Sequence, residues 1–122
     1  IPVYCVGTES DHVAPWKSVY KIHLLTDTEV TFVLTKGGHN AGIVSEPGRP
    51  RRHYRIGTRP AYGGYKTADS WVQDAELHQG SWWENWHAWL DKNSGAPQAT
   101  PAMGSKDYPA LEDAPGLYVM ER

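Results

Sequence analysis

The chain has 122 residues and a mass of 13.7 kDa, the size of one domain with a modest hydrophobic core. A formal net charge of -2 and an isoelectric point near 6.3 argue against a broad basic surface for nucleic acid or anionic lipid. The single cysteine, Cys5, excludes an internal disulfide framework and is typical of a reducing compartment, so we expect a cytoplasmic protein.

No segment approaches the roughly 18 consecutive apolar residues of a membrane span, and the first residues lack the charged-then-apolar pattern of a signal peptide. We therefore expect a soluble chain. Ile1 is not a methionine and begins what looks like the middle of an apolar strand. This start leads us to expect further protein before it.

The first third of the chain predicts a strand, a helix and a second strand. Residues 1–7 and 29–35 are apolar, β-branched runs that end near glycines, as buried strands do. Residues 16–25 place apolar side chains at largely helical spacing, after a proline that suits a first helical turn. Such a unit favours two parallel strands with a right-handed crossover, in a sheet covered on both faces.

The rest of the chain predicts a hairpin, two helices and a tail. Residues 42–45 and 53–56 flank a Pro/Gly/Arg turn and are expected to pair with each other. One helical pattern begins at Ala68, and a second covers residues 81–92 with an aromatic stripe mostly on one side. Its members are Trp82, Trp83, Trp86 and Trp89, which we expect to pack on the sheet or on a second subunit. The segment from Ala96 onward is rich in Pro, Ala, Gly and Ser, and we expect extended chain.

Two polar residues follow the two predicted parallel strands. Asp11 comes after the first strand and His39 after the second, so both emerge at the same edge of the sheet, where functional groups of open α/β sheets gather. A carboxylate bound to one imidazole nitrogen would orient the ring as a base. On pattern alone the alternative stays open that Asp11 caps the helix near Pro15 and that His39 is an ordinary loop histidine.

Other reactive side chains are interpreted as structural. Cys5 lies within an apolar strand, where a thiol behaves as a small buried hydrophobe, and no G-x-S-x-G elbow occurs in the chain. The remaining histidines show no ligand spacing, so we expect no metal and no cofactor; they are His12, His23, His53, His78 and His87. The basic cluster of Arg49, Arg51, Arg52 and Arg55 is interpreted as a solvated turn rather than a phosphate site.

Several motifs nonetheless carry a specific resemblance that covers nearly the whole chain. They are Pro2-Val3-Tyr4-Cys5, Glu9-x-Asp11-His12-Val13-x-Pro15-Trp16, Phe32-Val33-Leu34, Gly38-His39-x-Ala41-Gly42, Gly80-Ser81-Trp82-Trp83-x-x-Trp86-x-x-Trp89-Leu90 and Ala114-Pro115-Gly116-x-Tyr118-Val119. In these motifs the chain resembles the C-terminal part of a polyhydroxyalkanoate synthase.

The resemblance implies a partial α/β-hydrolase fold, made of the last parallel strands and the C-terminal helices of a three-layer sandwich. Residues 1–95 would be part of the catalytic domain and residues 96–122 a tail. It also implies an acyltransferase that polymerises 3-hydroxyacyl groups from coenzyme A thioesters with release of coenzyme A. Asp11 and His39 would be the triad aspartate and histidine, with the nucleophilic cysteine upstream of this chain.

The same resemblance implies partners and a location. The partners would be the upstream part of the catalytic domain, the 3-hydroxyacyl thioester and the growing polyester, in a cytoplasmic homo-oligomer at the polyester granule surface. Alone, the chain would be inactive. Two alternatives stay open: a related esterase, depolymerase or thioesterase with an upstream serine, and a non-catalytic assembly module that uses the tryptophan helix and the sheet edge.

Overall fold

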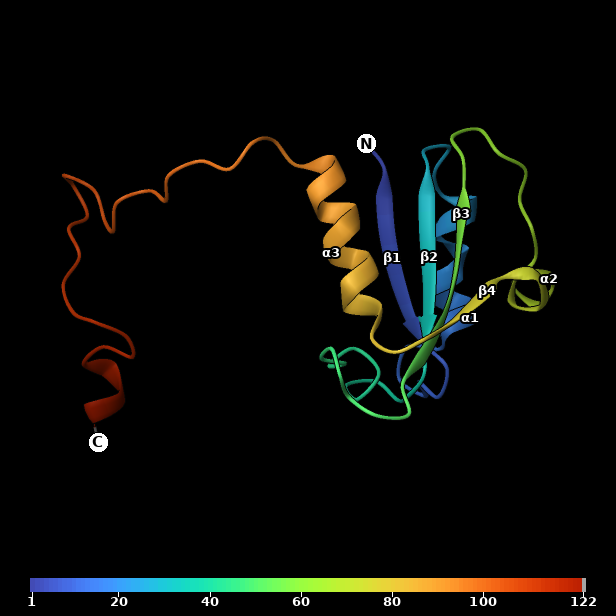
Figure 1. The fold of residues 1–122 in the computed structure, drawn as a ribbon. Coiled ribbons are helices and arrows are strands. Elements are labelled where there is room, and N and C mark those ends of the chain that lie inside the picture. The colour runs from blue at the N-terminus through green and yellow to red at the C-terminus, as the bar shows by residue number, and fades with distance from the viewer. Residues whose placement is uncertain (122) are drawn as a thin grey trace.

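A computed structural model describes residues 1–121 as a four-stranded sheet with helices on both faces (Figure 1). In chain order the elements are β1 (Val3–Thr8), α1 (Trp16–Val19), the 3₁₀ helix η1 (Tyr20–Leu24), β2 (Val30–Thr35), β3 (His53–Arg59), α2 (Ala68–Asp74), β4 (Glu76–Gln79), α3 (Trp82–Asn93) and the 3₁₀ helix η2 (Tyr118–Met120). The strands lie in the order β1-β2-β3-β4.

The first two strands are parallel, as their sequence predicts, and run in register from the pair Val3–Val30 to the pair Thr8–Thr35. The next two strands are antiparallel to their neighbours, so the sheet is mixed. The expectation of a set of parallel strands is therefore correct for β1 and β2 only. Strand β4, which the sequence did not predict, pairs with the first half of β3.

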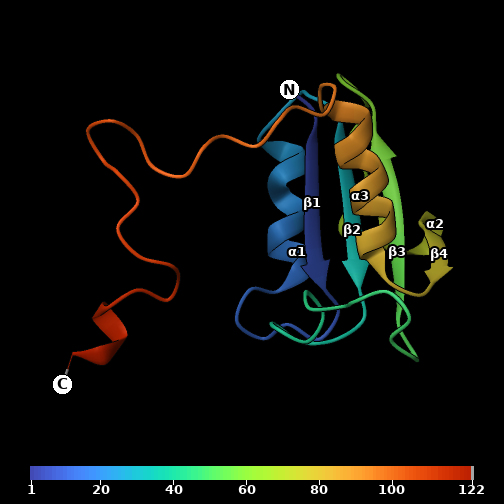
Figure 2. The same ribbon diagram turned by 60° about the vertical axis from the view of Figure 1, so that its left-hand side comes forward.

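Both faces of the sheet are covered, as the apolar runs predict. On one face Phe32 and Leu34 pack with Tyr20 and with Trp71 of α2. On the other face Val33 packs with buried side chains of β3 and α3, Tyr54 and Trp82. Figure 2 shows the resulting layers, with α3 on one side of the sheet and α1 on the other. Every residue of β2 is buried, because this strand has neighbours on both edges and both faces.

The predicted helix over residues 16–25 is α-helical only in its first turn and continues as a 3₁₀ helix. Tyr20 and His23 are both buried in it. A 3₁₀ helix has three residues per turn, so side chains three apart in sequence lie on the same side. The tighter winding thus directs both aromatic rings toward the sheet, where they pack against each other at 4.4 Å.

The predicted hairpin between residues 42–45 and 53–56 is wrong. Residues 38–44 curl into a turn, in which the amides of Gly42 and Val44 donate to the carbonyls of Gly38 and Asn40. The partner of 53–59 is instead the free edge of β2, from the pair Thr35–Tyr54 to the pair Val30–Arg59. Pairing with a long buried strand satisfies more backbone groups than a short hairpin would.

The two later helices agree with the sequence, since α2 begins at Ala68 and α3 ends at Asn93. Beyond α3, residues 96–121 run away from the sheet as mostly exposed chain (Figure 1). The backbone bridge between Gly104 and Pro109 joins two points of this segment itself. Among residues 1–121, no helix is long and apolar enough to cross a membrane.

Candidate functional site

Asp11 and His39 lie together at one end of the sheet. Because β1 and β2 are parallel, their carboxyl ends share an edge, and the loops that follow them meet there (Figure 1). His39 Nδ1 lies 2.9 Å from Asp11 Oδ2. The two residues that the sequence singled out as a candidate acid and base are therefore in direct hydrogen-bond contact.

The carboxylate of Asp11 is held from several directions. Its Oδ1 accepts hydrogen bonds from the amides of Val13 at 2.9 Å and Ala14 at 2.8 Å. Its Oδ2 faces His39 and the hydroxyl of Thr8, which donates at 3.3 Å. These bonds, above all that from Ala14, together with those from His39 and Val13, lower the pKa of Asp11 to about 2. Asp11 is therefore an anion throughout the neutral range.

The ionised carboxylate indicates which ring nitrogen of His39 carries a proton. A carboxylate can only accept hydrogen bonds, so we assign the ring proton of His39 to Nδ1. The other ring nitrogen, Nε2, is then the basic one. The Asp11 side chain is 7% exposed and that of His39 is 49% exposed. The imidazole is thus oriented and half exposed, whereas its anionic partner is largely covered.

The helix-cap interpretation of Asp11 is wrong. The N-cap of α1 is Pro15, and no side chain accepts a hydrogen bond there. Asp11 instead holds the turn before the helix, through the amides of Val13 and Ala14. Since that turn positions the carboxylate, the same two bonds that lower its pKa also aim it at His39.

The loop that carries His39 is fixed by residues for which the sequence suggested only packing. The indole of Trp82 donates to the carbonyl of Gly42 at 3.2 Å, and that of Trp83 to the carbonyl of Ile43 at 2.9 Å. The hydroxyl of Ser81 donates to the carbonyl of Ser45. The N-cap and first two residues of α3 therefore hold the loop after His39 by its backbone carbonyls. The tryptophan stripe signals this helix, but its periodicity does not identify these acceptors.

Gly42 permits the close approach of this loop to β1. A Cβ added at Gly42 would lie 2.5 Å from Cγ2 of Thr8, a separation that real Cβ atoms do not adopt. Thr8 in turn donates to Asp11. The glycine therefore brings the His39 loop against the end of the strand that leads to its partner.

His53 also lies at this edge of the sheet. Interpreted from sequence as a bystander, this residue has its Nε2 3.4 Å from Glu9 Oε1. The four arginines do not act as one cluster: Arg49 pairs with Glu46 at 3.3 Å, whereas Arg55 donates to the carbonyl of Ala75 beyond α2. This dispersal agrees with a turn stabilised by local contacts.

Cys5 lies apart from the pair. It packs on the α1 and α2 face of the sheet, beside the cluster around Phe32, and burial raises the pKa of its thiol. Both features are typical of a structural cysteine. Within residues 1–121, no group of three or more His, Cys, Asp or Glu side chains is placed to hold a metal ion.

Comparison with known proteins gives consistent relatives. No family model matches the chain. It is 40% identical over 122 residues to the poly(3-hydroxyalkanoate) polymerase subunit PhaC of Rhizobium etli, covering 100% of this chain and 19% of the relative. It is 37% identical over 121 residues to the subunit PhaC of Cupriavidus necator, covering 98% of this chain and 20% of the relative.

A third relative is the poly(3-hydroxyalkanoate) polymerase of Methylorubrum extorquens, with 39% identity over 122 residues, 98% of this chain and 19% of the relative. The chain thus spans about a fifth of the length of these proteins. The resemblance stated from the motifs is confirmed: over its full length, this chain is homologous to a part of the poly(3-hydroxyalkanoate) polymerases.

Proposed function

We propose that this chain is the C-terminal part of an acyltransferase domain of the α/β-hydrolase type. That enzyme would polymerise 3-hydroxyacyl groups from coenzyme A thioesters, in the cytoplasm and at the surface of its polyester. Asp11 and His39 are its acid and base. The nucleophile, a cysteine, belongs to the larger portion of the polymerase that this chain does not span.

One observation carries the proposal: the ionised Asp11 binds Nδ1 of a half-exposed His39, which leaves Nε2 free of that bond to act as a base. A nucleophile with an oriented base and a third group behind it is the general arrangement of covalent acyl transfer. Homology to poly(3-hydroxyalkanoate) polymerases supports the choice of substrate class.

In the first half of the reaction, His39 Nε2 takes the proton of the cysteine thiol, and the thiolate attacks the thioester carbonyl. The bond from the acyl carbon to the coenzyme A sulfur breaks, and the leaving thiolate takes the proton from the imidazolium. Asp11 stabilises the imidazolium while it exists.

In the second half, the hydroxyl of a 3-hydroxyacyl unit attacks the acyl-cysteine. Its proton passes to His39 Nε2 as the ester bond forms and the bond to the cysteine sulfur breaks. The released thiolate then takes the proton back, which restores the starting state. Each half therefore uses the same nitrogen, first as a base and then as an acid.

The test replaces His39 in the polymerase that contains this chain. His39→Ala should abolish polymer formation and coenzyme A release, whereas His87→Ala, at an exposed position on α3, should leave both unchanged. The 122-residue chain alone should not cleave 3-hydroxybutyryl coenzyme A. Ordinary activity of the His39 variant would refute the triad. Thioester cleavage by the chain alone that Cys5→Ala abolishes would instead make Cys5 the nucleophile.

A related esterase or thioesterase would use the same acid and base with a serine nucleophile. A non-catalytic assembly role is a second candidate, and one observation favours it: β1 forms an edge of the sheet and is paired only with β2 within the described residues. The two roles are compatible, because an unpaired strand edge invites association.

A further inference from the structure

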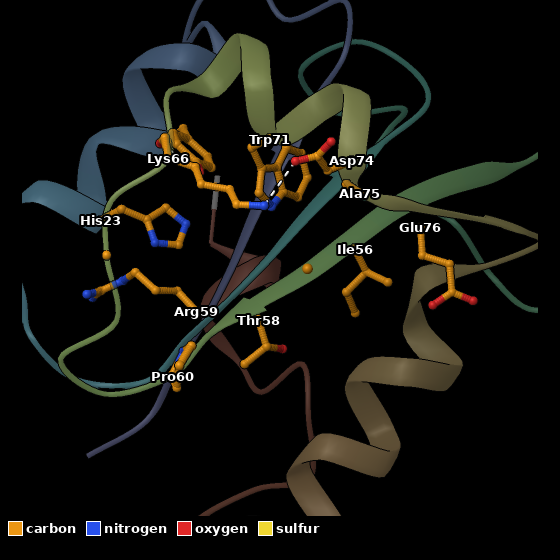
Figure 3. A pocket seen from close by; sticks show the side chains of 13 residues that line it. His23, Ile56, Thr58, Arg59, Pro60, Lys66, Trp71, Asp74, Ala75 and Glu76 are labelled. Carbon is orange, nitrogen blue, oxygen red and sulfur yellow. Dashed lines mark hydrogen bonds and ion pairs between the residues drawn. The ribbon is translucent and has the colours of Figure 1, made fainter.

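A cavity lies on the α1 and α2 face, at the end of the sheet away from His39. It has a volume of 370 Å³ and lies between η1, α2 and the second half of β3 (Figure 3). Arg59, in its wall, pairs with the first residue of β2, whereas His39 follows the last. The five steps between the first and last of the 6 residues of that strand separate its two ends by about 16 Å, at roughly 3.3 Å per residue. The volume is within the range of small-molecule sites.

His23 is a buried polar residue of this wall. It is 6% exposed, and neither ring nitrogen has a hydrogen-bond partner among residues 1–121. Burial, and secondarily the charge of Arg59, lower its pKa, so the ring is neutral at pH 7 and offers one donor and one acceptor. In Figure 3 the ring faces the space between Lys66 and Arg59. Buried polar atoms without partners are uncommon in folded proteins and call for a physical account.

The charge on this side of the cavity is positive. Among the described residues, Arg59 donates only to backbone carbonyls: Nη1 to Gly63 at 3.0 Å, and Nη2 to Thr26 at 2.6 Å and to Thr28 at 3.0 Å. Its Nε is buried without a partner in the part of the chain that the structure describes. Within residues 1–121 no carboxylate forms an ion pair with Arg59. Its positive charge is therefore balanced by dipoles alone.

The two acidic residues of the wall do not cancel this charge. Asp74 lies 2.9 Å from Lys66 Nζ, so its charge is already paired. The side chain of Glu76 is 76% exposed. Both lie across the cavity from His23 and Arg59 (Figure 3). An anion beside His23 would meet the positive side of the cavity.

The remaining wall is aromatic and apolar. Tyr20, Trp71 and Ala75 line it and are buried. Gly57 keeps the space for the indole, because a Cβ there would lie 2.7 Å from Nε1 of Trp71. Such a wall accepts a hydrocarbon group, and the indole N–H of Trp71 is a further donor.

We propose that this cavity binds a small organic carboxylate, with the anion beside His23 and Arg59 and the hydrocarbon part against Tyr20 and Trp71. The assignment is independent of the proposed acyl transfer, since it uses no residue of the Asp11–His39 edge. It therefore stands or fails separately.

Benzoate is a suitable probe, and benzyl alcohol is its neutral counterpart of similar size. In the 122-residue chain with ¹⁵N-labelled histidine, benzoate should shift the ring signals of His23 saturably and leave those of His87 in place. Benzyl alcohol should bind about tenfold more weakly or worse, because a hydrogen bond to a charged group is worth at least that factor. His23→Phe should weaken benzoate by about the same factor, and His87→Phe should not.

Equal binding of benzyl alcohol and benzoate would overturn the anion assignment and leave an apolar cavity only. Absence of any saturable shift at His23 would overturn the site itself. Both readings come from the unsubstituted chain, so they hold even if His23→Phe fails to fold. A failure of acyl transfer in the polymerase would leave them unaffected.

Discussion

Asp11 has donors on both carboxylate oxygens, two backbone amides on one and Thr8 and His39 on the other. The backbone amides keep their bonds whatever the state of His39. A pKa of about 2 thus results both from the turn over residues 11–14, whose Ala14 amide has the largest effect, and from His39.

This depressed pKa predicts a contribution to stability that depends on pH. The value in the folded chain is about 2, against about 3.9 for an unperturbed aspartate. The contribution is therefore complete above about pH 4 and is lost as the pH falls toward 2. Urea unfolding of Asp11→Asn between pH 2 and pH 7 should show a smaller loss on acidification than the unsubstituted chain. Asp107→Asn, in the exposed tail, should keep the full loss, and equal slopes for all three proteins would contradict the prediction.

At the scale of elements, the His39 loop lies between the end of β1 and the first turn of α3. Gly42→Ala should destabilise the chain by about 1–3 kcal/mol, since overpacking of this size has that cost, and should displace His39 from Asp11. Gly38→Ala is the matched control, because a Cβ there meets only an ordinary contact of 3.7 Å with the carbonyl of Ser10. Its effect should stay within about 0.5 kcal/mol.

Chemical denaturation measures both free energies, and the histidine ring signals report the contact with Asp11. If Gly42→Ala were as stable as Gly38→Ala, the close approach to Thr8 would not constrain the loop.

The elements also show what local sequence could and could not predict. The strand over residues 30–35 was predictable from its continuous β-branched, apolar run, and the helix from Ser81 from its helical period; each also carries its own boundary signal. The partner of residues 53–59 was not, since a half-buried strand pairs equally well with any free edge and the choice depends on tertiary structure. The stripe of tryptophans predicted a buried face but not the bonds to Gly42 and Ile43, because those acceptors belong to a loop far away in the sequence.

The proximity of Asp11 and His39 was the feature of the site that the sequence predicted most directly. Parallel strands place their following loops at one edge, so the order of elements alone brings Asp11 near His39. The cavity around His23 was not predictable, because its walls come from η1, β3 and α2, whose packing no local pattern encodes. Residues brought together by topology are readable from sequence, whereas those brought together by packing are not.

At the scale of the whole molecule, the described residues leave apolar surface uncovered. Trp86 and Leu90 on α3 are 39% and 37% exposed, and among residues 1–121 no strand pairs with the outer edge of β1. We therefore expect the isolated chain to form dimers or higher oligomers, with a mass by light scattering that rises with concentration. Leu90→Glu should shift this equilibrium toward the monomer, and Leu111→Glu, in the tail, should not. A monodisperse monomer over a wide concentration range would refute this expectation.

The position of β2 also determines how the amide protons of this molecule exchange with deuterium. Its 6 residues are all buried, and its backbone bonds lie between two neighbouring strands, so opening them requires the sheet to come apart. These amides should be the last to exchange, at a rate set by global unfolding. The loop with His39 is attached directly to this strand. The loop that carries His39 therefore begins at the segment of the sheet that opens last.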